Sequence, residues 1–121
     1  MTRILIVDDS PTQINVLTRI LAKQGYEVIT AGDGAQGVDK ASSENPDLIL
    51  MDVVMPNLNG FQATRQITKN PATRHIPVIM LTSKEQETDK VWAERQGASD
   101  YLTKPPVETE LLQKIQALLQ Q

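Results

Sequence analysis

The stretch ILIVDDSP, residues 4–11, passes from four apolar residues into two adjacent carboxylates and then into a serine–proline pair. The apolar run is short and does not alternate with polar residues, which is typical of a parallel strand that is buried on both faces. Ser10 suits a helix N-cap, and Pro11 suits the first helical position. The stretch therefore predicts a buried strand at residues 3–7, followed at once by a helix.

The same order of short apolar run and helix-period segment recurs along the whole chain. Because strands and helices alternate and the connections are short, we expect one doubly wound α/β domain, with helices on both faces of a parallel sheet. The predicted strands cover residues 3–7, 26–30, 47–51, 77–81 and 99–102, and the predicted helices cover residues 11–24, 35–44, 61–70, 84–96 and 107–120.

The composition excludes several classes of function. The 121 residues fit a single domain, and the absence of cysteine excludes disulfides and thiolate metal ligands and suits a cytoplasmic protein. No apolar run approaches the ~20 residues of a membrane-spanning helix. The net charge is -3 and basic residues form no cluster, so we expect neither a membrane nor a nucleic acid as a direct partner.

Polar side chains gather at the predicted carboxyl ends of the strands. Asp8 and Asp9 follow the first strand, Asp52 the third, Thr82 the fourth and Lys104 the fifth. Open α/β sheets bind ligands at this edge. If the first and third strands are neighbours, the three carboxylates converge and require a counter-charge. Oxygen ligands without cysteine favour Mg²⁺, or Mn²⁺, over zinc.

A carboxylate, a divalent cation, a hydroxyl and a lysine together form a site for phosphoryl transfer. Asp52 is the natural nucleophile and would form an aspartyl phosphate. The cation and Lys104 would neutralise the oxygens of the transferred group, and Thr82 would donate a hydrogen bond to one of them.

Taken alone, each of these residues also has an ordinary structural interpretation. The pair Asp8 and Asp9 suits an Asx turn or a helix N-cap. Thr82 or the following Ser83 suits the cap of the next helix, and Lys104 is by itself a solvated lysine. The functional interpretation depends on their occurring together at one edge of the sheet.

Four stretches resemble the receiver domain of bacterial two-component response regulators, along the full length of the chain. They are VDDS at 7–10, LMDVVMPNLNG at 50–60, LTS at 81–83 and YLTKPP at 101–106. The resemblance implies a flavodoxin-like (βα)5 fold with the strand order 2-1-3-4-5. It also implies that residues 1–121 form one receiver domain without an output domain.

The resemblance further implies a role for each matching position. Asp52 would accept a phosphoryl group from a histidine kinase. Asp9 would bind Mg²⁺ directly, Asp8 would act largely through water, and the backbone carbonyl of Val54 would be a further ligand.

Two switch residues and one unusual peptide bond follow from the same resemblance. Lys104 would pair with the phosphate, and its peptide bond to Pro105 is expected to be cis. Thr82 would turn toward the phosphate, and Tyr101 would move inward into the space that Thr82 leaves.

Two positions that tune the lifetime of the acyl phosphate in this family hold Val54 and Lys84 here. Valine cannot hydrogen-bond a hydrolytic water, whereas lysine can reach the phosphate region, so the lifetime stays open. Val54 also bears on a phosphatase alternative, because haloacid-dehalogenase-like phosphatases place a second Asp two residues after the nucleophile. A phosphorylation-independent scaffold is a third alternative, although it leaves the complete set of site residues unexplained.

The variable segments GFQATRQ at 60–66 and KEQETDKVWAERQGASDYLTKP at 84–105 are similar to stand-alone regulators of the PilH type. This similarity implies a histidine kinase of a chemotaxis-like system and a downstream target in pilus motor regulation, twitching motility or phototaxis. Output would pass through the face formed by the last two helices and the last strand, where Trp92 is either a core residue or a partner-facing anchor. A phosphate sink for a shared kinase is the alternative, and we expect a monomer or a weak dimer.

Overall fold

The structure is a computed structural model that describes residues 1–53, 55, 58–82 and 87–120. A five-stranded parallel sheet has the order β2-β1-β3-β4-β5, as the resemblance implies. The strands are β1 (Arg3–Val7), β2 (Glu27–Ala31), β3 (Leu48–Asp52), β4 (Val78–Thr82) and β5 (Asp100–Thr103). The strand order reverses between β1 and β3, so the carboxyl ends of these two strands border the crevice where ligands bind in such sheets.

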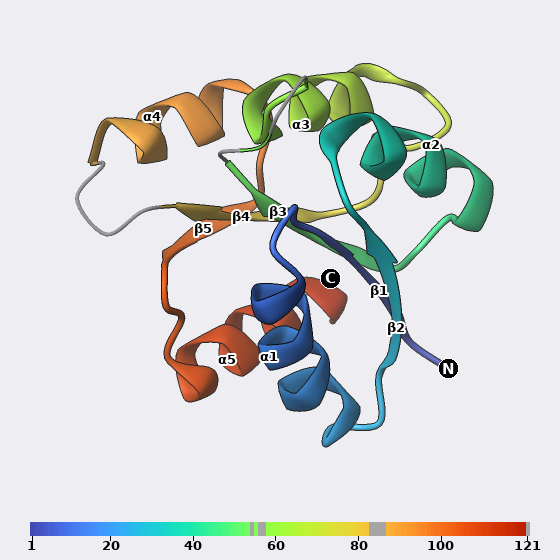
Figure 1. The fold of residues 1–121 in the computed structure, drawn as a ribbon. Helices are drawn as coiled ribbons and strands as arrows, with labels where there is room; N and C mark the ends of the chain where they lie inside the picture. Colours follow the sequence, from blue (N-terminus) through green and yellow to red (C-terminus); the bar gives the residue numbers. More distant parts are fainter. Residues whose placement is uncertain (54, 56–57, 83–86, 121) are drawn as a thin grey trace.

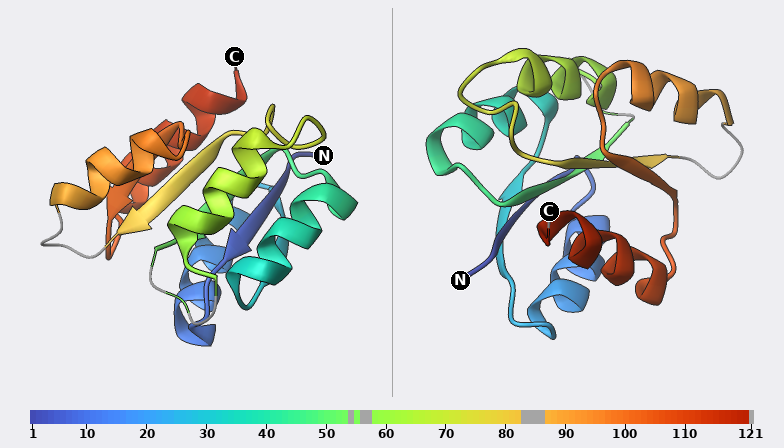
Figure 2. Two further views of the ribbon diagram at one scale, coloured as in Figure 1. Left: turned by 90° about the horizontal axis from the view of Figure 1, so that it is seen from above. Right: turned by 180° about the vertical axis from the view of Figure 1, so that it is seen from behind.

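Helices cover both faces of the sheet, as Figure 1 shows. The helices α2 (Gly34–Glu44), α3 (Gly60–Lys69) and α4 (Glu87–Arg95) lie side by side on one face (Figure 2, left). The helices α1 (Pro11–Ala22) and α5 (Glu108–Leu119) lie on the other face. The predicted doubly wound architecture is therefore confirmed.

Two aliphatic clusters form the core, one on each face of the sheet. Leu5, Val7 and Met51 belong to the cluster under α2, α3 and α4, whereas Ile4 and Ile6 belong to the cluster under α1 and α5. Successive side chains of a strand point to opposite faces, so a central strand that feeds both clusters must be apolar throughout. This requirement explains the unbroken apolar runs in the sequence.

The start of α1 follows the sequence prediction. Ser10 is the N-cap, and its side chain accepts a hydrogen bond from the backbone N–H of Gln13 at 3.3 Å, with Pro11 in the first turn. The helix ends at Ala22, two residues earlier than predicted, and Gly25 takes a left-handed φ of 81° in the turn that follows.

The strands β2, β3, β4 and β5 each begin and end one residue later than predicted, and the ends of β3 and β4 bear on the site. Asp52 and Thr82 are the last residues of β3 and β4, whereas the sequence analysis placed them just after the strands. Hydrogen bonding with the neighbouring strands extends the ladder: the N–H of Val53 donates to the carbonyl of Leu81, and the N–H of Lys104 donates to that of Thr82. Within the described part of the chain, no helix combines the length and the apolar character that crossing a bilayer requires.

Candidate phosphorylation and metal site

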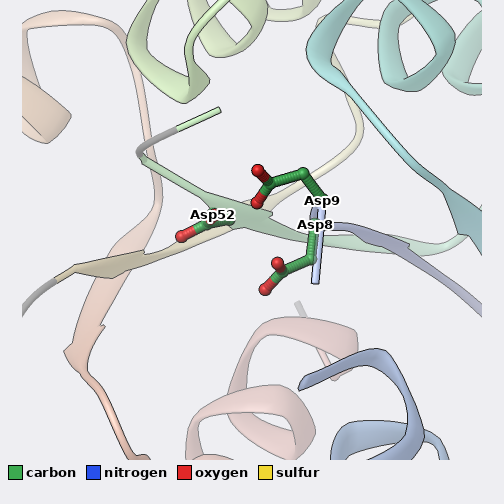
Figure 3. A group of neighbouring side chains, drawn as sticks. All are labelled: Asp8, Asp9 and Asp52. Carbon is green, nitrogen blue, oxygen red and sulfur yellow. The ribbon is translucent and has the colours of Figure 1, made fainter. Parts of the chain in front are cut away.

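Three carboxylates meet at the carboxyl ends of β1 and β3. One ligand oxygen from each of Asp8, Asp9 and Asp52 lies within 4.8 Å of the others. Figure 3 shows the three side chains side by side, two from the segment after β1 and one from the end of β3. This convergence requires β1 and β3 to be neighbours, and they are paired in register from Ile4 with Leu48 to Val7 with Met51.

Lys104 supplies a positive charge to this cluster. Its Nζ donates to Oδ1 of Asp52 at 2.6 Å and to Oδ2 of Asp8 at 3.2 Å. Both carboxylates are buried, at 6% and 1% exposure for Asp52 and Asp8. Two buried carboxylates that share one ammonium keep an excess of negative charge, which is the condition for binding a hard cation.

The two adjacent acids after β1 have different surroundings. Oδ1 of Asp8 accepts a hydrogen bond from the N–H of Ser10 at 2.9 Å, so the Asx-type interpretation of Asp8 also holds. Its other oxygen accepts a hydrogen bond from Lys104, so each oxygen of Asp8 already has one donor from the protein. Asp9 is exposed, and its carboxylate makes no hydrogen bond or ion pair with the residues that the structure describes. Asp9 is thus the acid that is free to accept a direct ligand bond.

The electrostatics of the site shift two pKa values. Burial raises the pKa of Asp52 above its usual value of 3.8, and the negative charges of Asp8 and Asp9 add to this effect, while the contact with Lys104 only partly opposes it. Burial by itself lowers the pKa of Lys104, but the hydrogen bond and charge of Asp52, aided by Asp8, outweigh burial and raise that pKa above 10.5. Lys104 therefore stays charged at neutral pH.

The predicted switch residues lie on the neighbouring strands. Thr82 ends β4, is 1% exposed, and its Oγ1 has no hydrogen-bond partner among the described residues. Tyr101 is half-buried on β5 and packs against the cluster under α2, α3 and α4. The peptide bond between Lys104 and Pro105 is cis, as expected. Val54, Ser83 and Lys84, to which the sequence analysis also assigned roles, lie outside the described residues.

The residues present fit a bound divalent cation. Hard cations prefer carboxylate oxygens, and the cluster offers one exposed and two buried carboxylates within reach of a single ion. The unpaired hydroxyl of Thr82 and the ammonium of Lys104 are donors that suit the oxygens of a transferred phosphoryl group.

The fold and this cluster define a signalling receiver, and the comparisons agree: the chain belongs to the response regulator receiver domain family, whose model matches residues 4–116. It is 60% identical to Protein PilH of Pseudomonas aeruginosa over 98% of both chains, so the similarity to the PilH type is confirmed.

Solved structures give the same result. The chemotaxis protein CheY4 of Vibrio cholerae is 32% identical, with a TM-score of 0.89 over 98% of both chains. The receiver domain of the sensor histidine kinase PA1611 of Pseudomonas aeruginosa is 35% identical, with a TM-score of 0.91 over 99% of this chain and 98% of that one. That structure contains a magnesium ion coordinated in its active-site cleft.

Two residues near the site were missed by the sequence analysis. Gly34 was not singled out, and Gly60 appears only within two quoted motifs, yet Gly60 lies against the backbone of Asp52 and Val53, and Gly34 lies against that of Leu58. A helix-initiating glycine is the only sequence signal, and the signal alone does not distinguish a close backbone contact from a flexible turn.

Proposed function

We propose that this protein is a cytoplasmic phospho-acceptor switch that takes a phosphoryl group from a histidine kinase onto Asp52 with the help of Mg²⁺. The observation that carries the proposal is the acidic cluster bridged by Lys104, whose Nζ contacts Asp52 and Asp8. The magnesium ion in the PA1611 receiver domain supports the choice of cation.

The reaction assigns a defined task to each side chain. A carboxylate oxygen of Asp52 attacks the phosphorus of a phosphohistidine, and the P–N bond breaks as the O–P bond forms. The leaving imidazole nitrogen keeps the electron pair and takes up a proton from solvent. Bound Mg²⁺ would offset the charge of the carboxylates and of the phosphoryl oxygens, with Asp9 as the direct ligand, Asp8 acting through water and the Val54 carbonyl as a further ligand.

After transfer, two residues acquire a new partner. The ammonium of Lys104 exchanges the Asp52 carboxylate for a phosphoryl oxygen, to which it is attracted more strongly because the phosphoryl group carries more charge. The hydroxyl of Thr82, buried and unpaired in the described structure, gains its first hydrogen bond. These gains favour a state in which Thr82 turns toward the phosphate and Tyr101 moves inward.

The output surface that we propose is the face of α4, β5 and α5. Val91 and Trp92 of α4 are each 49% exposed, and the guanidinium of Arg95 lies 5.3 Å from the centre of the Trp92 ring. A cavity of about 70 Å³ between α4 and β5 includes Tyr101 in its lining. An exposed aromatic on α4, the helix that contacts the strand of the proposed switch residue Tyr101, suits a protein partner whose affinity depends on phosphorylation.

The pathway that we propose is a chemotaxis-like system that acts on type IV pilus motility or taxis. The 60% identity to PilH supports this assignment. A kinase of such a system should transfer phosphate to this protein faster than an unrelated histidine kinase does. Equal transfer from both kinases would contradict the pathway but not the switch.

The decisive experiment is intact mass spectrometry after incubation with Mg²⁺ and a small phosphodonor. Wild type should gain one phosphate, and Asp52→Asn should gain none. Asp100→Asn is a matched control, because Asp100 also forms a carboxylate–lysine pair, with Lys114 at 2.9 Å, but lies outside the acidic cluster. Phosphate on the Asp52→Asn protein would refute the proposed acceptor.

A further inference from the structure

Two helices of the structure begin with a glycine that lies against the backbone following β3. A Cβ atom placed on Gly60 would lie 2.0 Å from the carbonyl oxygen of Asp52. A Cβ atom placed on Gly34 would lie 2.1 Å from the carbonyl oxygen of Leu58. Neither position can hold a larger residue unless the backbone moves, because the contacted atoms belong to the main chain.

Further contacts hold the described residues that follow Asp52. The N–H of Gly60 donates to the carbonyl of Val53 at 2.8 Å, which ties the start of α3 to the residue after the phospho-acceptor. Val53 and Met55 are buried in the core cluster under α2 and α3, and Leu58 packs against it. The first turn of α2 packs against one of these residues, Leu58, through the close contact of Gly34.

A second glycine of α2 lies against β1. A Cβ atom placed on Gly37 would lie 2.8 Å from both methyl groups of Val7, the residue before Asp8. Gly34 and Gly37 are three residues apart and share one face of the helix. The start of α2 thus contacts Val7, which precedes Asp8, and Leu58, which lies in the chain that follows Asp52.

We propose that Gly34 is a positioning residue for phosphorylation of Asp52. Because Gly34 has no side chain, α2 can lie close to Leu58. The helix thereby sets the distance between the acids after β1 and the backbone at Leu58. A methyl group at Gly34 must displace the Leu58 carbonyl by roughly 1 Å to reach an ordinary contact, and a misplacement of this size costs up to about 100-fold in rate at a reacting centre. This inference rests on the proposed function, which assigns no role to α2.

The test compares Gly34→Ala with two control variants. Gly32→Ala lies two residues away, and its added Cβ has only one neighbour within 4 Å, at 3.9 Å. Gly25→Ala introduces strain, because Gly25 has a φ of +81°, but its Cβ would have no neighbour within 4 Å. The first control tests a change near the site, and the second tests a loss of stability away from α2.

We would measure the Mg²⁺ dissociation constant by calorimetry and the phosphorylation rate by intact mass at saturating Mg²⁺, at a temperature where circular dichroism shows each variant folded. Gly34→Ala should bind Mg²⁺ or accept phosphate at least about tenfold less well than wild type. Both controls should stay within about twofold of wild type, although Gly25→Ala unfolds at a lower temperature.

If Gly34→Ala does not fold, a second pair of variants provides the test. Leu58→Ala keeps the atoms that Gly34 contacts but removes the side-chain packing that holds this stretch of backbone against the core. Ile20→Ala removes a comparable, partly buried side chain on the opposite face of the sheet. Leu58→Ala should slow phosphorylation and weaken Mg²⁺ binding, while Ile20→Ala should not.

The outcomes separate the two proposals. A folded Gly34→Ala protein with the Mg²⁺ affinity and rate of wild type would overturn the positioning role and leave the proposed function intact. If Gly34→Ala does not fold, the same conclusion follows when Leu58→Ala and Ile20→Ala have the same Mg²⁺ affinity and the same phosphorylation rate. Absence of any adduct on wild type would overturn the proposed function itself.

Discussion

Lys104 and Asp52 are 52 positions apart in the sequence, yet the Nζ of one lies 2.6 Å from the Oδ1 of the other. Lys104 directly follows β5 and Asp52 ends β3, and these two strands are separated in the sheet by β4. The N–H of Lys104 is held by the carbonyl of Thr82 at 2.7 Å, so the long side chain extends across the end of β4 to reach the carboxylate. The contact therefore joins three strands at the phosphorylation site.

Removing this ammonium should destabilise the protein without phosphate. In Lys104→Met, Asp8 and Asp52 lose their shared counter-charge, and we expect the free energy of unfolding to fall by about 1–3 kcal/mol. Phosphorylation of Asp52 should also slow. Urea denaturation measures the first effect. Lys114→Met is the control, because its pair with Asp100 is more exposed, with side chains 30% and 34% accessible, and should contribute less than about 1 kcal/mol. Equal losses in the two variants would contradict the importance of the Lys104 contact.

The raised pKa of Asp52 predicts how stability depends on pH. Between pH 3.8 and the raised pKa of the folded protein, Asp52 is mostly ionised in the unfolded chain but still mostly protonated in the folded protein. Rising pH then favours the unfolded state, so this residue contributes less stability at higher pH. The metal-free Asp52→Asn variant should therefore gain stability over wild type as the pH rises through this window, and the difference should then level off.

Thermal denaturation of both proteins in a chelator across pH 3 to 8 checks this expectation. Asp39→Asn serves as the control, because Asp39 is exposed on α2 and lies outside the acidic cluster. A difference between Asp52→Asn and wild type that shrinks with rising pH would contradict the assigned direction.

Binding of Mg²⁺ should stabilise the folded protein through Asp9. A ligand at 100 times its dissociation constant adds about 2.7 kcal/mol, so the melting temperature should rise with Mg²⁺ and fall back when a chelator is added. Asp9→Ala should lose this response. Its metal-free form should be at least as stable as wild type, because the substitution removes a repulsive charge from the cluster. Asp39→Ala should keep the full response, and a clear loss of metal-free stability in Asp9→Ala would count against this account.

The unpaired hydroxyl of Thr82 should matter only after phosphorylation. Thr82→Val removes a buried Oγ1 that has no partner among the described residues, so stability without phosphate should be unchanged or slightly higher. The phosphorylated form should be less stable, because the proposed hydrogen bond to the phosphoryl group is lost. The lifetime of the adduct, followed by intact mass, measures this effect, and Thr82→Ser should restore it.

A second buried threonine provides the matched control. Thr64 of α3 also has a buried Oγ1 without a partner among the described residues. Thr64→Val should resemble Thr82→Val in stability but leave the lifetime of the adduct unchanged. If both variants alter the lifetime equally, Thr82 has no specific contact with the phosphate.

Local features of this chain were readable from the sequence because they depend on neighbouring residues. The cap formed by Ser10 and Pro11 uses hydrogen bonds within one helical turn, and the apolar runs reflect burial on both faces of the sheet. The approximate place of Asp8, Asp9, Asp52, Thr82 and Lys104 at one edge followed from the same pattern. The strand order, the different metal-binding roles of Asp8 and Asp9 and the switch movement of Thr82 came only from the resemblance to receiver domains.

The sequence alone predicts a set of strands and helices and a group of polar residues at the carboxyl ends of the strands. The tertiary structure decided which of these residues touch. Pairing with neighbouring strands placed Asp52 and Thr82 inside β3 and β4, and the position of β5 let Lys104 bridge two acids. The close approach of Gly34 to Leu58 likewise depends on how α2 packs. Each of these contacts joins segments that are distant in sequence. Local conformational preferences along the chain do not set the distance between such segments, because that distance depends on how the strands and helices pack.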